Sequence, residues 1–170
     1  MGGQAKAYPT GKLYLLHREQ LIPRPIEEVF AFFKDVRHLE ASTPPWLHFQ
    51  IVTPQPIHLQ VGTEIEYQLA WRFIRFRWKT AIRQWQPPDF FVDVQSRGPY
   101  RLWEHTHSFR SEQAGTRMVD SVRYQLPLGI LGRIAHRLRV RHDLDRIFDH
   151  RADTIGRLLG GSPGSAKKAE

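Results

Sequence analysis

The middle of the chain alternates between apolar and polar residues, and this pattern constrains the fold more than any other feature. The alternation runs through residues 64–71 and 74–83, and further strand-like segments follow at 90–95, 102–109 and 116–125. Period-two alternation is typical of strands that bury one face and expose the other to water. From residue 131 to residue 159 the apolar residues recur at helical spacing instead. At ~1.5 Å per residue this helix would be about 40 Å long, enough to cross a whole sheet. We therefore expect an α+β fold.

The N-terminal part of the chain predicts a strand followed by helical structure. Residues 13–21 are rich in leucine and β-prone. Pro25 suits the first position of a helix, two glutamates follow it in the first turn, and apolar residues recur at helical spacing to Val36. The pair Pro44-Pro45 is expected to prevent any helix there. The alternation in residues 47–51 predicts another short strand.

The formal net charge of the 170-residue chain is +8, which raises the question of a nucleic-acid partner. Much of the excess is arginine spread along residues 74–83 and the C-terminal helix, and no nucleic-acid recognition motif is present. We therefore expect no nucleic-acid binding. The polar face of residues 74–83 is basic, whereas Glu64 and Glu66 lie on the polar face of the neighbouring strand. Cross-strand ion pairs are expected between these faces.

The length of the chain corresponds to one domain. We expect a flexible N-terminus at residues 1–11, a folded domain at 12–159 and a disordered tail at 160–170, which is rich in Gly, Ser and Lys. Cysteine is absent, which excludes disulfides, thiolate catalysis and cysteine-ligated metals. No secretory signal and no apolar run of the ~20 residues needed to span a membrane is recognisable. We therefore expect a cytoplasmic protein.

Three stretches of the sequence carry a resemblance to a known family. They are PIEEVFAFFKDVRHLEASTPPWLHF at 25–49, FVDVQSRGPYRLWEHTHSF at 91–109 and LPLGILG at 126–132. Together they resemble the SRPBCC superfamily (START and polyketide cyclase/dehydrase-like proteins), and most closely its bacterial stand-alone ligand-binding members. The resemblance implies the helix-grip fold, in which a curved antiparallel sheet of about six to seven strands wraps around a long C-terminal helix, with one or two short helices after the first strand. It also implies a hydrophobic cavity between the sheet and that helix.

Two neighbouring strands carry polar residues on the face that should point inward. His105 and His107 lie on one face of residues 102–109, between aromatic residues. Asp120 lies on the apolar face of the next strand and is expected opposite one of the two histidines. A carboxylate in that position would orient an imidazole and raise its pKa. Asp93 and Gln95 on the preceding strand are further candidates, although the sequence leaves the orientation of that strand open.

Three interpretations of this cluster remain open. It can be a buried polar network that fixes the strand register, a site for the polar end of an apolar ligand, or a catalytic or metal-binding site. A His-x-His pair on a strand places both imidazoles on one side, as in zinc and non-haem iron sites. The sequence completes no known metal signature, however, so neither a metal nor another cofactor is predicted.

We expect the protein to bind a hydrophobic small molecule, lipid-like or polyketide-like, in the internal cavity. The expected lining residues are Tyr67, Trp78, Trp103, His105, His107, Asp120 and Tyr124. The alternative is an enzyme of the cyclase/dehydrase type, in which His105, His107 and Asp120 transfer protons.

An apolar segment and then a basic segment lead into the C-terminal helix. Residues 126–132 contain two glycines and a proline, and residues 133–141 contain four arginines, from Arg133 to Arg141. An ordinary connection and a solvated helix face with internal ion pairs would account for both segments. The alternative is a transient contact with an anionic membrane.

Overall fold

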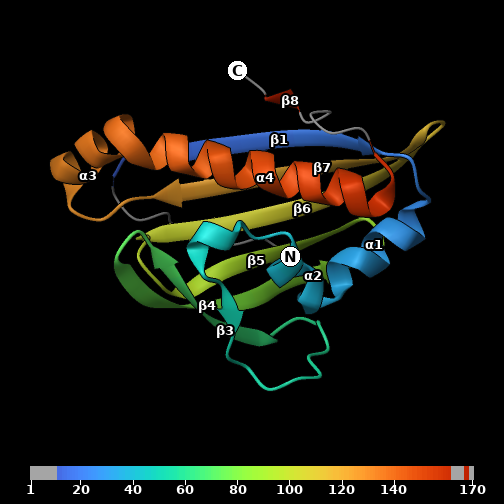
Figure 1. The fold of residues 1–170 in the computed structure, drawn as a ribbon, viewed down its shortest axis with the longest axis horizontal. Helices are drawn as coiled ribbons and strands as arrows, with labels where there is room; N and C mark the ends of the chain where they lie inside the picture. Colours follow the sequence, from blue (N-terminus) through green and yellow to red (C-terminus); the bar gives the residue numbers. More distant parts are fainter. Residues whose placement is uncertain (1–10, 162–166, 169–170) are drawn as a thin grey trace, which may run out of the picture.

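One antiparallel sheet forms most of the protein (Figure 1). The computed structural model describes residues 11–161 and 167–168. The strands follow the order β2-β3-β4-β5-β6-β7-β1-β8 across the sheet. Their bounds are β1 Tyr14–Ile22, β2 Gln50–Ile51, β3 Glu64–Trp71, β4 Ile74–Gln86, β5 Phe90–Arg97, β6 Leu102–Glu112, β7 Gly115–Gln125 and β8 Lys167–Lys168. The strands predicted from the alternation are present, and they form the antiparallel sheet that the resemblance implied.

Helices follow the first strand and the last long strand. The first group is α1 Ile26–Lys34, α2 Val36–Ala41 and the 3-10 turn η1 Pro45–Leu47. The second group is α3 Gly129–Ala135, the π-helical segment η2 His136–Val140 and α4 Arg141–Leu159. Figure 1 shows the second group as one rod that crosses the sheet, with α1 beside its C-terminal end. This arrangement is the helix-grip fold that the resemblance implied.

The chain around the proline pair differs from the prediction. Pro45 opens the turn η1 at the first helical position, where the missing N–H group costs no hydrogen bond. The proline pair therefore permits one short helical turn, and the strand expected at 47–51 is reduced to β2. Pro25 is the N-cap of α1 rather than its first residue.

The C-terminal helix begins earlier than predicted, at Gly129. Leu128 and Gly129 make the reversal from β7 with φ values of 65° and 49°. A Cβ atom added to Gly132 would lie 2.1 Å from the carbonyl oxygen of Pro127, so only glycine allows this close approach. Residues 129–132 are therefore the first turn of the helix and not part of a connection.

Most of the two expected flexible ends lies outside the described residues. Of the expected N-terminal segment, only Gly11 is described. Within the expected tail, Gly160 adopts a φ of 82° at the C-cap of α4, and β8 pairs with Arg18 and Glu19 of β1. In the described part of the chain, no helix is both long enough and apolar enough to cross a bilayer.

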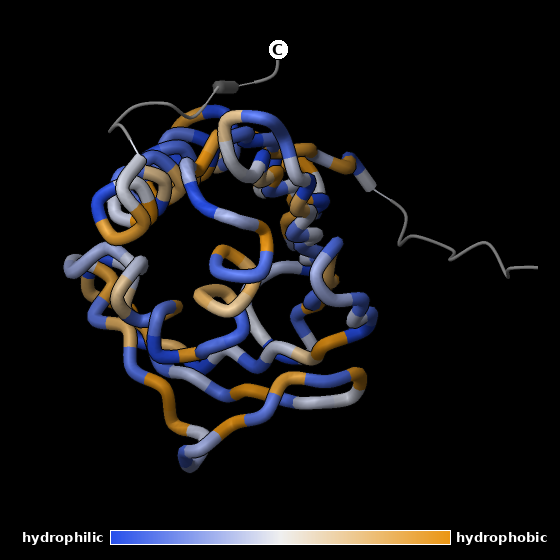
Figure 2. Tube along the Cα trace, turned by 90° about the vertical axis from the view of Figure 1, so that its right-hand side faces the viewer, coloured by the Kyte–Doolittle hydropathy of each residue, from blue (hydrophilic) through white to orange (hydrophobic). Residues whose placement is uncertain are grey.

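The outer face of β3 and β4 carries the ion pairs that the sequence predicted. Arg77 Nη1 lies 3.0 Å from Glu66 Oε1, and Lys79 Nζ lies 3.0 Å from Glu64 Oε2. Such exposed pairs contribute at most about 1 kcal/mol each. Hydrophobic and hydrophilic positions alternate along the strands in Figure 2. Alternate residues of β7 are buried, including Met118 and Val122, so the apolar face of the sheet points inward.

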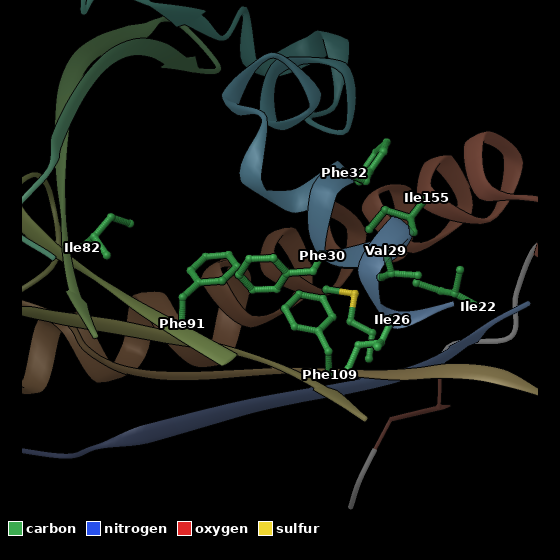
Figure 3. Close-up of a cluster of buried hydrophobic side chains, with 10 residues drawn as sticks. Ile22, Ile26, Val29, Phe30, Phe32, Ile82, Phe91, Phe109 and Ile155 are labelled. Carbon is green, nitrogen blue, oxygen red and sulfur yellow. The ribbon is translucent and has the colours of Figure 1, made fainter. Parts of the chain in front are cut away.

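Phe30 of α1 lies at the centre of a core beside the C-terminal end of α4 (Figure 3). Its ring centroid is 5.6 Å from that of Phe109 and 6.2 Å from that of Phe91, with near-perpendicular planes in both cases. Ile155 of α4 belongs to the same cluster and is 1% exposed. These contacts attach both helices to β5 and β6.

The substitution Ile155→Ala should lower the free energy of unfolding by about 2–5 kcal/mol, because it leaves a cavity in this core. Urea denaturation followed by circular dichroism measures the change. Leu158→Ala in the same helix is the matched control, because Leu158 is 54% exposed. Equal losses in the two variants would contradict the assigned packing of α4.

Candidate functional site

A cavity of about 360 Å³ lies between the inner face of the sheet, α4 and the helices after β1. Its walls are mainly apolar and unusually aromatic. The aromatic lining residues are Phe32, Phe33, Phe49, Tyr67, Trp71, Phe76, Trp78, Phe91, Tyr100, Trp103 and Phe148. A cavity of this volume and lining is typical of sites for small organic molecules.

The structure places five of the seven residues that were expected to line the cavity on its wall. They are Tyr67, Trp78, Trp103, His105 and His107. Asp120 lies behind the two histidines and is not a lining residue. Tyr124 is not a lining residue either, because its hydroxyl is hydrogen-bonded to His136 Nε2 at 2.8 Å and its ring stacks on Tyr14. The start of the C-terminal helix thus covers Tyr124.

The polar groups of the cavity wall are hydrogen-bonded to one another. The Tyr67 hydroxyl and Thr80 Oγ1 are 3.0 Å apart, and Trp78 Nε1 donates to the same oxygen at 3.0 Å. Trp71 Nε1 donates to Asp143 Oδ2 at 2.9 Å, which holds the β3–β4 turn to the start of α4. The apolar cavity wall therefore contains a few hydrogen-bonded polar groups, and none of these groups is an unpaired charge.

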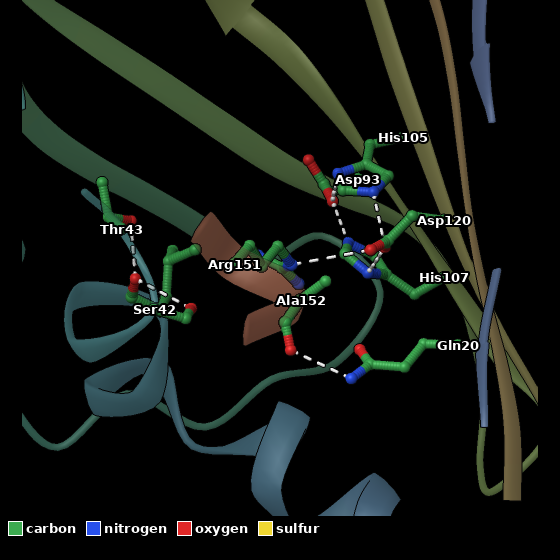
Figure 4. A network of polar contacts seen from close by, with 10 residues as sticks. Gln20, Ser42, Thr43, Asp93, His105, His107, Asp120, Arg151 and Ala152 are labelled. Carbon is green, nitrogen blue, oxygen red and sulfur yellow. Dashed lines mark hydrogen bonds and ion pairs between the residues drawn. The ribbon is translucent and has the colours of Figure 1, made fainter. Parts of the chain in front are cut away.

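Two histidines and two aspartates meet at one place on the cavity wall (Figure 4). His105 and His107 are neighbours on one face of β6, and β-sheet pairing places Asp93 opposite His105 and Asp120 opposite His107. Asp120 Oδ1 lies 2.8 Å from His105 Nε2 and 2.9 Å from His107 Nδ1. Asp93 Oδ2 lies 3.1 Å from His107 Nε2 and 3.9 Å from His105 Nδ1. Each imidazole therefore has one nitrogen toward each carboxylate.

Arg151 of α4 completes the cluster from the opposite side (Figure 4). Its Nε lies 3.6 Å from Asp120 Oδ2, and the side chain is 12% exposed. Arg151 is not among the site residues predicted from the sequence. A signal was present, because Arg151 shares a helical stripe with Leu144, Phe148 and Ile155, which are all buried. A charged residue within such an apolar stripe indicates a buried partner.

Asp93 was only a candidate in the sequence analysis, and the register of β5 and β6 now places it in the cluster. Gln95 does not join it. The amide of Gln95 donates to the Tyr100 carbonyl oxygen at 2.7 Å and accepts from the Tyr100 amide at 3.2 Å. Gln95 therefore stabilises the turn between β5 and β6.

The cluster shifts the pKa values of its members in different directions. Burial disfavours a charge on His107, but the hydrogen bonds to Asp120 and Asp93 outweigh burial and raise its pKa. Burial and the neighbouring His107 lower the pKa of His105 despite the contact with Asp120. The upward shift expected for the histidine opposite Asp120 thus applies to His107, its partner in the sheet register, and not to His105. Burial would raise the pKa of Asp120, but Arg151 and the histidines hold it well below its ordinary value.

A helix-grip fold that encloses an aromatic cavity with a buried polar cluster is typical of ligand-binding folds. The family model described as polyketide cyclase / dehydrase and lipid transport matches residues 22–147. The chain therefore belongs to this family, as the resemblance in the sequence indicated. No curated protein matches the sequence significantly.

Several solved structures share the fold at low sequence identity. Protein Ms6760 from Mycobacterium smegmatis is 15% identical with a TM-score of 0.63, over 86% of this chain and 90% of that one. TTHA0849 from Thermus thermophilus is 19% identical with a TM-score of 0.63, over 88% of this chain and 100% of that one. Ara h 8.0201 is 14% identical with a TM-score of 0.61, over 87% and 98% of the two chains. These likenesses establish the fold.

The substitution Asp120→Asn should destabilise the protein by about 3 kcal/mol, because it leaves the buried Arg151 without a charged partner. Chemical denaturation at neutral pH measures the loss. Glu40→Gln on the exposed surface of α2 removes the same charge and should change stability by less than about 0.5 kcal/mol. A small loss for both variants would show that the cluster is not held together by Asp120.

Proposed function

We propose that the protein binds a hydrophobic small molecule, lipid-like or polyketide-like, in the cavity between the sheet and α4. The observation that carries this proposal is the combination of aromatic walls with one buried polar cluster. Apolar surface removed from water provides affinity, and a few placed polar groups provide orientation. Membership of a family described by cyclase, dehydrase and lipid-transport activities supports the same class of ligand.

The polar cluster favours a ligand with an oxygen atom at one end. Arg151 lines the cavity and carries N–H donors, whereas both ring nitrogens of His107 already face Asp93 and Asp120. The aromatic rings around them, such as those of Phe91 and Phe148, suit a flat or extended apolar body. The centroids of Phe91 and His107 are only 4.2 Å apart, so a ligand oxygen at the cluster would lie directly beside an apolar wall.

A second candidate function is proton transfer of the cyclase/dehydrase type. It is favoured by the opposite pKa shifts of two imidazoles on the same cavity wall. A histidine with a raised pKa suits a general acid, and its neighbour with a lowered pKa suits a general base. In this function Asp120 would orient both rings without touching the substrate.

We propose that the cavity opens beside residues 126–141 and the β3–β4 turn, a surface called the mouth below, because Leu126, Val140 and Trp71 line the cavity there. This surface has features that suit contact with an anionic membrane. Five large apolar residues at the start of the C-terminal helix are exposed, and they are Leu128, Ile130, Leu131, Ile134 and Leu138. Arg133 and Arg137 are exposed among them. Phe73 is 99% exposed at the β3–β4 turn, which the hydrogen bond from Trp71 to Asp143 holds to the start of α4. Leu126, the first residue of the apolar segment, and Val140 of η2 line the cavity. We include in the proposal that the ligand enters and leaves through this surface.

Filling the cavity should abolish ligand binding without unfolding the protein. Ile147→Trp adds a large side chain at a half-buried position on the cavity wall, and Leu158→Trp makes the same change on the exposed side of the same helix. Native mass spectrometry of each protein, followed by organic extraction, measures what has co-purified. A fluorescent fatty acid then serves as a defined probe for titration. We expect at least a tenfold loss of probe affinity for Ile147→Trp only, an effect of about 1.4 kcal/mol.

Two outcomes would contradict the binding proposal. Equal probe affinity in Ile147→Trp and Leu158→Trp would place the probe outside the cavity. Turnover of a small carbonyl compound that is lost in His105→Gln, with binding of the compound retained, would instead favour the enzymatic function.

Charge reversal at the mouth should weaken binding to anionic vesicles. Arg133→Glu combined with Arg137→Glu changes two exposed positions, and each basic residue near such a surface contributes about 1 kcal/mol. Cosedimentation with phosphatidylserine-containing vesicles measures the effect, which should exceed tenfold at low salt. Arg83→Glu combined with Arg110→Glu makes the same change in net charge at exposed positions on β4 and β6. Similar losses in both double variants would indicate unspecific attraction and contradict membrane contact at the mouth.

A further inference from the structure

Three potential metal ligands converge on the cavity wall. Asp93, His105 and His107 each offer one ligand atom, and these atoms lie within 4.8 Å of one another. All three residues line the cavity. They come from the adjacent strands β5 and β6, where Asp93 pairs directly with His105 and His107 follows two positions later on the same face. The ligand set is thus held by the rigid part of the fold.

The two distances from Asp93 to the histidine nitrogens are close to those of a coordination shell. Donor atoms about 2.0–2.1 Å from a tetrahedral zinc ion lie ~3.3 Å apart. His107 Nε2 and Asp93 Oδ2 are already 3.1 Å apart. His105 Nδ1 is 3.9 Å from the same oxygen, so a side-chain adjustment of about 0.6 Å would bring it to this spacing.

Asp120 occupies the position of an outer carboxylate behind these ligands. It faces His105 Nε2 and His107 Nδ1, which are the nitrogens opposite those that face Asp93. A histidine that binds a metal commonly donates its other N–H group to a carboxylate, which fixes the tautomer and the ring orientation. When Asp120 accepts from both rings, both remaining nitrogens direct lone pairs toward the Asp93 carboxylate. The lone pairs and the carboxylate repel one another unless a proton or a metal cation lies between them, and a metal cation can serve both nitrogens at once.

The net charge of the cluster also favours the binding of a cation. Asp93 and Asp120 bring two carboxylates, and Arg151 brings one guanidinium group, which contacts Asp120 through Oδ2. His107 Nδ1 is buried and close to Asp120 Oδ1 but lacks a well-aligned hydrogen bond. With both imidazoles neutral, two carboxylates and one guanidinium group leave the cluster with a net charge of −1, which a bound cation would offset.

We propose that Asp93, His105 and His107 bind a divalent transition metal ion of the zinc or ferrous type, with Asp120 orienting the two imidazoles. Two imidazoles and one carboxylate form the donor set that such ions prefer. The remaining coordination positions face the cavity, where a water molecule or an oxygen atom of the bound molecule would complete the shell. The metal would then polarise that oxygen. The site does not depend on which ligand the cavity carries.

Titration of tag-free, chelator-treated protein with Zn²⁺ alone tests the proposal by isothermal titration calorimetry. We expect one ion per chain with micromolar or tighter affinity. Asp93→Asn and His107→Gln should each weaken binding by at least about 100-fold, since each removes a direct ligand. The matched controls are Asp89→Asn and His142→Gln, which change an exposed aspartate and an exposed histidine and should leave affinity unchanged.

A second measurement keeps the test valid if a ligand variant fails to fold. Co²⁺ added to the unmodified protein should give intense visible absorption bands of a four- or five-coordinate ion with nitrogen ligands. A spectrum like that of aqueous Co²⁺, or Zn²⁺ affinity unchanged in both ligand variants, would overturn the proposal. The fatty-acid probe is titrated in parallel into metal-free protein, so failure of the metal site and failure of ligand binding give separate results.

Discussion

The packing of one long helix against one side of a curved sheet determines the rest of this structure. α4 is fixed over β1, where Gln20 Nε2 donates to the Ala152 carbonyl oxygen at 2.9 Å and the buried Arg18 pairs with Asp145. A single helix is only about 10–12 Å wide, so it cannot cover the whole inner face of the sheet. The inner surfaces of β3, β4 and β5 face α4 across a space that their aromatic side chains line without filling. The cavity is thus a consequence of covering a wide sheet with a narrow element.

The same geometry explains why the polar cluster is stable in an apolar interior. His105, His107 and Asp120 lie on strands close to the helix, where Arg151 can reach them from α4. Buried charges are tolerated only when they are paired. The cluster therefore joins the sheet and the helix through charge as well as through packing. Since four of its members, Asp93, His105, His107 and Arg151, line the cavity, these charges are also available to a bound molecule.

The fold and part of the site could be predicted from the sequence, because both depend on local periodicity. Alternation indicates which face of a strand is buried. It assigns His105, His107 and Asp120 to inward faces without any knowledge of their partners. Asp93 could not be placed in this way, since residues 90–94 are apolar on both faces and only the pairing with β6 decides the matter. The positions of Arg151 and Tyr124 relative to the cavity depend on where the C-terminal helix lies over the sheet. The alternation in β7 correctly predicts that Tyr124 is buried. It carries no information about the start of the C-terminal helix, which separates Tyr124 from the cavity.

The π-helical segment η2 determines which side chains at the start of the C-terminal helix point into solvent. Gly132 and His136 are buried and Val140 lines the cavity, so the inward residues before Leu144 are spaced four apart. A regular α-helix has about 3.6 residues per turn, and counted back from Leu144 it would instead turn Arg133 and Arg137 toward the interior. The wider turn of a π segment absorbs this difference in rotational phase. One locally unwound turn thus keeps two guanidinium groups in solvent and leaves the apolar cavity free of their charge.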